Sequence, residues 1–176
     1  EGLVMGTRCG DLDPAIVPFL MEKEGLDTAG INHLMNKESG VLGLSELSSD
    51  MRVFEEAIRA GPGHPHHERS LLVLQHYTGR IKRYIGSYAA AMGGLDSVVF
   101  TGGVGENFPE VCDWSCQGLE FLGISSVKAR PPDGHVAEVS HPESVTTVLI
   151  VPTNEELAIA RDTLEVLCSG QGAAEC

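Results

Sequence analysis

The stretch VVFTGGVGEN, which runs from Val98 to Asn107, decides the fold class of this chain. Its first residues end an apolar run that starts at Leu95, and β-branched and aromatic residues are typical of a buried parallel strand. Three glycines follow within this stretch, and glycine lets the backbone turn sharply and approach a ligand closely. The pattern predicts an α/β fold in which a mostly parallel sheet is flanked by helices.

Strand and helix patterns alternate on both sides of this stretch. A second β-rich run, Val145 to Val151, predicts another strand, and Gly2 to Thr7 predicts a short one. Apolar residues at helical spacing predict helices over 14–21, 28–35, 51–60, 65–92, 109–119 and 155–167. Gly61 and Gly93 are expected to end two of these helices, and Asn154 or Thr153 is expected to cap the last one. Residues 38–49 are rich in Gly and Ser and predict a loop, and residues 124–141 allow short edge strands.

Three predicted loops directly follow strands: Arg8 to Asp13, Thr101 to Asn107 and Pro152 to Glu156. Ligands of parallel sheets bind beyond the carboxyl ends of the strands, so these loops are the expected site. The glycines of the middle loop match neither the dinucleotide fingerprint nor the P-loop. On the glycines alone, a nucleotide site and a simple tight turn are equally open.

A few charged residues near these loops could carry chemistry. Arg8 could stabilise a phosphoryl group during transfer, or it could pair with an aspartate of its own loop. Asp50 is most simply a helix cap and Arg52 a solvated charge. Glu155 begins the last helix, where it could favour the helix dipole or bind Mg²⁺.

Composition excludes several classes of function. The 176 residues carry a formal net charge of −13, which disfavours nucleic-acid binding through a broad basic face. No apolar run approaches the roughly 20 residues of a membrane span, and no signal peptide is visible. Five cysteines without a Cys-x-x-Cys pair predict reduced thiols and a cytoplasmic protein. The histidines at 64, 66 and 67 predict a solvated loop before a helix rather than a metal site.

Five segments together resemble successive motifs of the acetate kinase family, in the family's order and at similar spacing. They are GTRCGDLDPA (Gly6 to Ala15), ESGVLGLSELSSDMR (Glu38 to Arg52), VVFTGGVGEN (Val98 to Asn107), GLEFLGI (Gly118 to Ile124) and VPTNEELAIARDT (Val151 to Thr163). The resemblance covers nearly the whole chain. It implies a C-terminal nucleotide-binding domain over residues 1–168 and a flexible tail over 169–176.

This resemblance implies a ribonuclease-H-like domain of the acetate and sugar kinase, Hsp70 and actin superfamily, lacking its first strands. The implied reaction is the reversible transfer of the γ-phosphoryl group of ATP to acetate, which gives acetyl phosphate and ADP with Mg²⁺. Propionate or butyrate stays open as the acid. The family also implies a homodimer formed through this part of the chain, with the long helix predicted over 65–92 as a candidate interface.

The roles of individual residues follow from the resemblance. Arg8 matches the arginine that stabilises the transferring phosphoryl group, and Glu155 matches the magnesium-associated glutamate. The nucleotide-binding positions are Asp50, Met51, Arg52, Gly103, Val104, Gly105, Glu106 and Asn107.

The chain also departs from the family's pattern. Cys9 stands where Ser is usual, Cys112 where an Arg commonly follows the glycine-rich loop, and Val145 and Thr146 lack an Arg common before the last strand. The first two predict altered polarity near the site. The family's remaining catalytic groups lie upstream of Glu1, so we expect little or no kinase activity from this chain alone. A non-catalytic module for nucleotide binding or dimerisation is the alternative.

Overall fold

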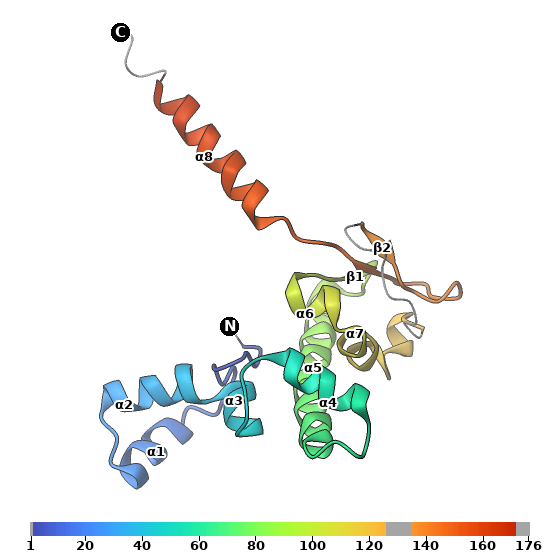
Figure 1. Ribbon diagram of the computed structural model, residues 1–176. Helices are drawn as coiled ribbons and strands as arrows, with labels where there is room; N and C mark the ends of the chain where they lie inside the picture. The colour runs from blue at the N-terminus through green and yellow to red at the C-terminus, as the bar shows by residue number, and fades with distance from the viewer. Residues whose placement is uncertain (1, 126–134, 172–176) are drawn as a thin grey trace.

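The computed structural model describes residues 2–125 and 135–171, which form an α/β structure (Figure 1). Three strands make one small sheet in the order β1-β3-β2, where β1 is Ser97–Phe100, β2 is Ala137–Glu138 and β3 is Thr147–Ile150. β1 and β3 are parallel, and β2 runs antiparallel to β3. The α/β class is confirmed, and the predicted edge strand makes the sheet of the described residues a mixed one.

Three helices at the centre of the molecule form within three residues of the predicted bounds 51–60, 65–92 and 109–119. They are α4 (Met51–Ala60), α5 (His67–Met92) and α7 (Pro109–Cys116), and α5 packs against both of the others. Asp50 caps α4, and Gly61 ends it with a φ of 81°. Gly93 ends α5 in the left-handed conformation, which glycine adopts without steric cost.

The predicted first strand is absent: described residues 2–15 form neither strand nor helix. The N–H groups of Val41 and Leu42 donate to the carbonyls of Met5 and Gly6, each at 2.9 Å. These backbone groups are therefore satisfied by a helical segment rather than by a neighbouring strand. A short apolar run cannot by itself distinguish the two arrangements, which is why the prediction was wrong.

The predicted loop at residues 38–49 is largely helical, which is a second correction. The helix α2 (Thr28–His33) continues into a π-helical turn, η1 (Leu34–Glu38), and α3 (Gly40–Ser45) follows. Gly40 has a φ of 66°, which allows the chain to bend between η1 and α3. Ser39, Gly40 and Ser45 lie here at helix ends, and within the predicted loop only residues 46–49 are non-helical after α3.

The helix α1 (Ile16–Glu24) was expected to pack apolar side chains into a core, and it does not. None of its residues is buried, and Ile16 and Phe19 are 44% and 56% exposed. The helix also begins later than predicted, at Ile16 rather than at Pro14. The Asp13 carboxylate accepts the N–H of Ala15 at 2.8 Å, so it caps the turn before the helix.

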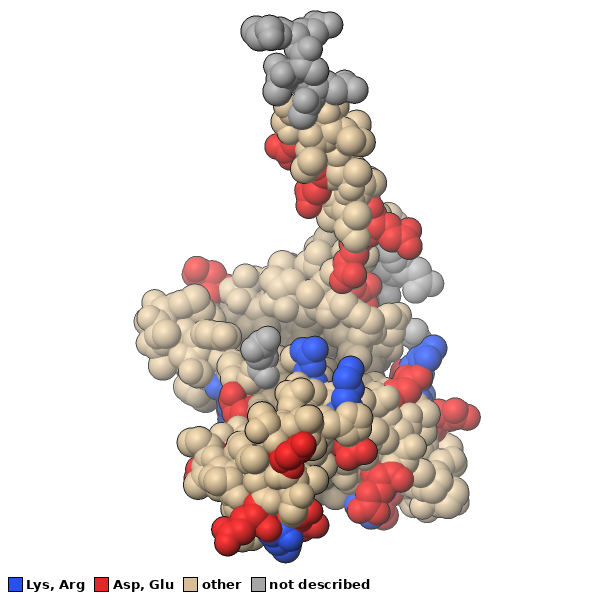
Figure 2. All heavy atoms as spheres, turned by 90° about the vertical axis from the view of Figure 1, so that its left-hand side faces the viewer, with Lys and Arg blue, Asp and Glu red and all other residues tan. Residues whose placement is uncertain are grey.

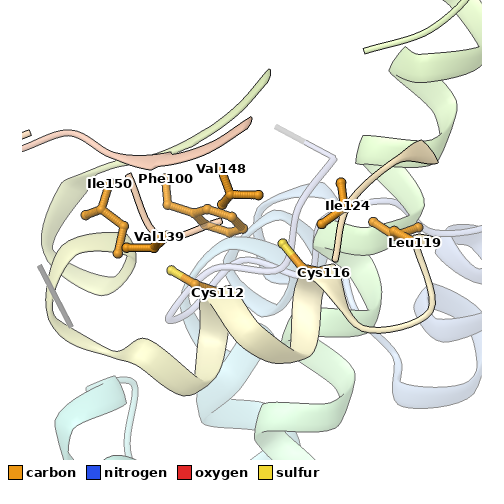
Figure 3. Close-up of a cluster of buried hydrophobic side chains, with 8 residues drawn as sticks. All are labelled: Phe100, Cys112, Cys116, Leu119, Ile124, Val139, Val148 and Ile150. Atoms are coloured by element: carbon orange, nitrogen blue, oxygen red, sulfur yellow. The ribbon is translucent and has the colours of Figure 1, made fainter. Parts of the chain in front are cut away.

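The first of two hydrophobic clusters lies between the sheet and α7 (Figure 3). Phe100, Val148 and Ile150 point from the strands toward Cys112 and Cys116 on the helix. All five side chains are at most 7% exposed, so the sheet is covered on this face. Val99 points the other way and is 51% exposed, so the expectation of a fully buried strand was wrong for the opposite face.

The second cluster joins α4, α5 and α7 to the start of the chain. Phe54 and Leu74 are fully buried at its centre, and Val4, Val41 and Phe108 pack around them. Burying Val4 fixes the start of the chain although it forms no strand. This cluster therefore holds the segment around Arg8 against the helices.

The last helix, α8 (Glu155–Gln171), projects away from the rest of the molecule in Figure 1. Asn154 accepts the N–H of Leu157 at 3.0 Å, which confirms the predicted cap. Every side chain of the helix up to Ser169 is exposed. The helix is longer than predicted and includes 169–171, and the remaining tail, 172–176, lies outside the described residues. Within the described residues, no helix is both long and apolar enough to cross a membrane.

Acidic side chains are spread over the face shown in Figure 2 and along the projecting helix, where basic ones are fewer. This distribution agrees with the formal net charge of −13. No broad basic face is visible on this side of the molecule.

The cysteines divide into protected and reactive groups, and this division predicts their labelling. Burial raises the pKa of both Cys112 and Cys116 to about 12, whereas Cys168 is exposed and Cys9 half-buried. Because only the thiolate reacts, alkylation of the native chain at pH 8 should modify Cys168 while it leaves Cys112 and Cys116 intact. Peptide mapping after a short iodoacetamide pulse checks this, with the urea-unfolded chain as the fully labelled control. Equal labelling of Cys112 and Cys168 would contradict the packing described here.

Candidate nucleotide-binding site

One cavity of about 700 Å³ brings together much of the predicted site. It lies where the start of α4 meets α6 (Gly102–Asn107) and the segment before Arg8. Six predicted nucleotide-binding residues line it: Asp50, Met51, Arg52, Gly103, Val104 and Asn107. Ligand cavities in proteins typically measure about 300–1,000 Å³, so this one has the size for a nucleotide.

Asp50 and Arg52 form a fixed pair at the start of α4. The carboxylate of Asp50 accepts both the backbone N–H of Arg52 and its side-chain Nε–H, each at 3.0 Å. These hydrogen bonds from Arg52 lower the pKa of Asp50 to about 2, so the carboxylate stays ionised at neutral pH. The pair holds the guanidinium of Arg52, whose side chain is 86% exposed, in the cavity wall.

The glycine-rich stretch turns directly into a helix rather than staying a loop. The helix α6 starts at Gly102, whose φ of 73° lets the chain leave β1 at a sharp angle. No atom lies within 4 Å of the position that a Cβ of Gly103 would take, so its backbone is open toward the cavity. Asn107 closes the helix by donating from Nδ2 to the carbonyl of Gly103 at 2.9 Å.

The other two predicted residues of this stretch lie outside the cavity lining. Gly105 is buried, and a Cβ there would lie 3.4 Å from the backbone carbon of Phe100. Glu106 accepts the N–H and the hydroxyl of Thr153, each at 2.9 Å. These two hydrogen bonds lower the pKa of Glu106, and they tie α6 to the loop after β3.

Arg8 lies beside the cavity, and its neighbours Met5 and Gly6 are part of the lining. Its side chain is exposed and, among the described residues, forms no ion pair with Asp11 or Asp13. Asp11 instead contacts α5, and Asp13 caps the turn before α1. The alternative that Arg8 pairs within its own loop is therefore wrong for this structure.

Glu155 and the histidines were the candidate metal ligands. Glu155 is exposed in the first turn of α8 and does not line the cavity. His66 donates its N–H to His64 Nδ1 at 3.2 Å, and His67 Nδ1 lies 3.2 Å from the carbonyl oxygen of Ala57. No cluster of three or more His, Cys, Asp or Glu side chains within residues 2–125 and 135–171 could hold a metal ion.

The cavity also contains residues that sequence reasoning did not select. Glu55 and Arg59 share a helix face with Arg52, and helical periodicity from Arg52 could have found them. Tyr77 comes from α5, and burial raises its pKa. Only the packing of α5 on α4 brings Tyr77 here, so no local sequence signal points to it.

Cys9 and Cys112, the cysteines at positions where the family usually has other residues, lie outside the cavity lining. Cys112 is fully buried in the first cluster, and its Sγ donates to the carbonyl of Gly105 at 3.4 Å. Cys9 Sγ donates to the carbonyl of Gly10 at 3.3 Å. Neither cysteine lines the cavity.

Comparison with known proteins assigns the family. The Acetokinase family profile matches residues 1–161. The chain belongs to the acetokinase family. It is 54% identical over 168 residues to the acetate kinase of Alkaliphilus metalliredigens and 52% identical over 169 residues to that of Porphyromonas gingivalis. Each match covers 95% of this chain and 41% of the relative.

Solved structures of this acetokinase family share its fold. The crystal structure of Porphyromonas gingivalis acetate kinase matches with a TM-score of 0.83 and 50% identity, over 95% of this chain and 41% of that one. A propionate kinase from Francisella tularensis matches with a TM-score of 0.78 and 30% identity, over 91% and 40%. The chain thus spans about 41% of the length of the acetate kinases that it matches. These matches confirm the resemblance and the fold class.

Proposed function

We propose that this chain is the nucleotide-binding part of an acetate kinase, which transfers the γ-phosphoryl group of ATP reversibly to acetate. The cavity carries the proposal. It joins two segments, 50–52 and 103–107, that lie far apart in the sequence and that the family resemblance assigns to the nucleotide. Apolar side chains such as Met51, Val104 and Phe108 line it beside a few polar groups, as is usual for nucleotide-sized ligands.

The residues of the cavity suit the two ends of a nucleotide. Arg52 and Arg59 line the cavity, where they pair with Asp50 and Glu55, and their guanidinium groups match phosphate geometry well. The open backbone at Gly103 and the apolar wall at Val104 allow a flat ring to lie against α6. Binding of a polyanion here would therefore rely on guanidinium donors and the open backbone rather than on an excess of positive charge.

Arg8 and Glu155 complete the proposed reaction. The guanidinium of Arg8 is exposed and unpaired among the described residues, so it is free to stabilise charge on the transferring phosphoryl group. Glu155 would hold Mg²⁺, directly or through water, because its exposed carboxylate is an oxygen donor of the kind that Mg²⁺ prefers. Mg²⁺ usually takes one or two carboxylates plus substrate phosphates, and when bound it neutralises phosphate charge.

Acetate is favoured over propionate or butyrate as the acid. The relatives named acetate kinase are 54% and 52% identical to this chain, and the propionate kinase is 30% identical. A cytoplasmic location belongs to the same proposal. So does a homodimer, since α5 leaves Leu72 and Met92 exposed at 45% and 66%. Sedimentation of the purified protein tests the dimer, which a purely monomeric mass would exclude. A non-catalytic nucleotide-binding or dimerisation module is the alternative function.

Titration of the chain with Mg²⁺-ADP tests the site. Replacing Arg52 or Asn107 by Ala is expected to weaken binding about 10-fold, because a hydrogen bond to a charged group contributes about 1.5–3 kcal/mol. Calorimetry measures the dissociation constants, and circular dichroism shows whether each variant is folded. Arg83→Ala is the matched control, since it removes an exposed arginine from α5 outside the cavity lining.

The outcomes separate the alternatives. Equal weakening by Arg52→Ala and Arg83→Ala would show that net charge, and not the cavity, governs binding. Phosphoryl transfer is then assayed with acetate, ATP and Mg²⁺ in the chain alone and in the full-length protein that contains it. We expect turnover only in the latter, and comparable turnover in both would contradict the need for the upstream groups.

A further inference from the structure

We propose that Asp11, Tyr84 and Arg80 are positioning residues that hold the loop of Arg8 in place from the long helix α5. The inference rests on the proposed function, because it concerns the aim of Arg8 at the transferring phosphoryl group. We call these three residues the Asp11 link. None of the three lines the cavity, and none was selected from the sequence.

The link consists of two short hydrogen bonds to one residue of the loop. The hydroxyl of Tyr84 donates to Oδ2 of Asp11 at 2.7 Å, and Nη2 of Arg80 donates to the backbone carbonyl of Asp11 at 2.8 Å. Arg80 Nη1 also lies 3.9 Å from Asp11 Oδ2. The side chain of Arg80 is only 21% exposed, so its position on α5 is restricted. Asp11 is therefore held through both its backbone and its side chain.

The backbone around the link leaves no space for movement toward α5. A Cβ at Gly2 would lie 1.4 Å from the hydroxyl of Tyr84, and a Cβ at Gly10 would lie 2.6 Å from the carbonyl oxygen of Gly2. The N–H of Asp11 donates to that same carbonyl at 2.9 Å. Residues 2 and 3 are thus held between Tyr84 and the end of the Arg8 loop.

The opposite end of the loop is fixed from a different side. The N–H of Met5 donates to the carbonyl of Arg8 at 3.1 Å, and the N–H of Cys9 donates to the carbonyl of Met35 at 3.0 Å. The guanidinium of Arg8 itself has no partner among the described residues. The position from which this side chain starts is consequently set by its backbone, which is held between these bonds on one side and the Asp11 link on the other.

The hydroxyl of Tyr84 stays a donor under working conditions. Its hydrogen bond to the Asp11 carboxylate raises the pKa of Tyr84, so the phenol is protonated at neutral pH. Tyr84→Phe removes the hydroxyl that donates to the Asp11 carboxylate. Among the described residues, no other side chain of the link lies within 3 Å of this carboxylate. The loop would then be free to shift, and a misplacement of about 1 Å can cost roughly 100-fold in rate.

The test uses Tyr84→Phe in the full-length protein that contains this chain. We expect kcat to fall about 10-fold, with the KM for ATP unchanged, since none of the three residues of the link lines the nucleotide cavity. Tyr88→Phe is the matched control: it removes a hydroxyl from the next turn of α5, on a ring 59% exposed and 5.9 Å from that of Tyr84. The control is expected to retain the kcat of the unmodified protein.

A double-mutant cycle with Arg8→Ala separates positioning from general destabilisation. If Tyr84 acts through Arg8, Tyr84→Phe should have no further effect once Arg8 is replaced. Amide exchange at Asp11 should also quicken in Tyr84→Phe and stay unchanged in Tyr88→Phe. If Tyr84→Phe does not fold, Asp11→Ala tests the same link, because it removes the acceptor of the Tyr84 hydroxyl and should lower kcat in the same way.

The outcomes for this inference and for the proposed function differ. An unmodified full-length protein without phosphoryl transfer to acetate would end the proposed function and the inference with it. An active protein in which Tyr84→Phe keeps full kcat would overturn the inference alone. So would an equal loss of kcat on Tyr84→Phe with and without Arg8.

Discussion

Replacing Arg8 by Ala in the full-length protein that contains this chain is expected to lower the kcat of the proposed phosphoryl transfer about 10³-fold, the low end of the range for arginines that stabilise a phosphoryl group in transfer. The guanidinium is exposed, has no partner among the described residues and lies next to Met5 and Gly6 of the cavity wall. Its removal therefore deprives the developing charge of a cation without removing a contact that holds the fold. Steady-state kinetics with acetate and ATP measures the change.

The matched control for this prediction is Arg8→Lys. Lysine keeps the charge but loses the planar fork, so we expect an intermediate kcat. ADP binding should change little in either variant, because the side chain of Arg8 is not part of the cavity lining. A kcat within 10-fold of the unmodified value in Arg8→Ala, or a loss confined to ADP affinity, would remove Arg8 from the reaction.

The parts of the fold that the sequence predicts are those with local causes. Asp50, Gly61, Gly93 and Asn154 act on the backbone within a few residues, and each begins or ends a helix as predicted. The strand predicted at residues 2–7 and the loop predicted at 38–49 failed because these two segments hydrogen-bond to each other. Neither pattern contains information about that partner.

The candidate site likewise contains residues that the sequence could identify and residues whose place depends on distant partners. Resemblance to a family gave Asp50, Arg52 and Asn107, and the structure places them around one cavity. It also gave Glu106, which does not line the cavity and whose carboxylate joins α6 to the loop after β3 by accepting hydrogen bonds from Thr153. Tyr77 could not be found at all, because its place in the cavity depends on how one helix packs on another.

The largest effect on stability is expected from Gly40→Ala. Gly40 has a φ of 66°, and a Cβ there would lie 2.2 Å from the carbonyl oxygen of Met5 and 2.7 Å from that of Arg8. Both neighbours are backbone atoms held by the hydrogen bonds between the two segments, so they cannot rotate away. The left-handed conformation costs an L-residue about 1–2 kcal/mol, and forcing atoms into a packed region costs about 1–3 kcal/mol more.

Gly25→Ala is the control that separates these two costs. Gly25 has the same φ of 66° at the end of α1, but no atom lies within 4 Å of its Cβ position. Urea unfolding should show a loss of about 1 kcal/mol for Gly25→Ala and about 3 kcal/mol for Gly40→Ala. Gly40→Ala should also lower kcat in the full-length kinase, because relieving the clash moves the backbone of Arg8, whereas Gly25→Ala should not. Equal losses of stability in the two variants would mean that the backbone of Met5 and Arg8 moves away from the added Cβ at no cost in free energy. Segment 35–42 would then not hold the Arg8 loop in place.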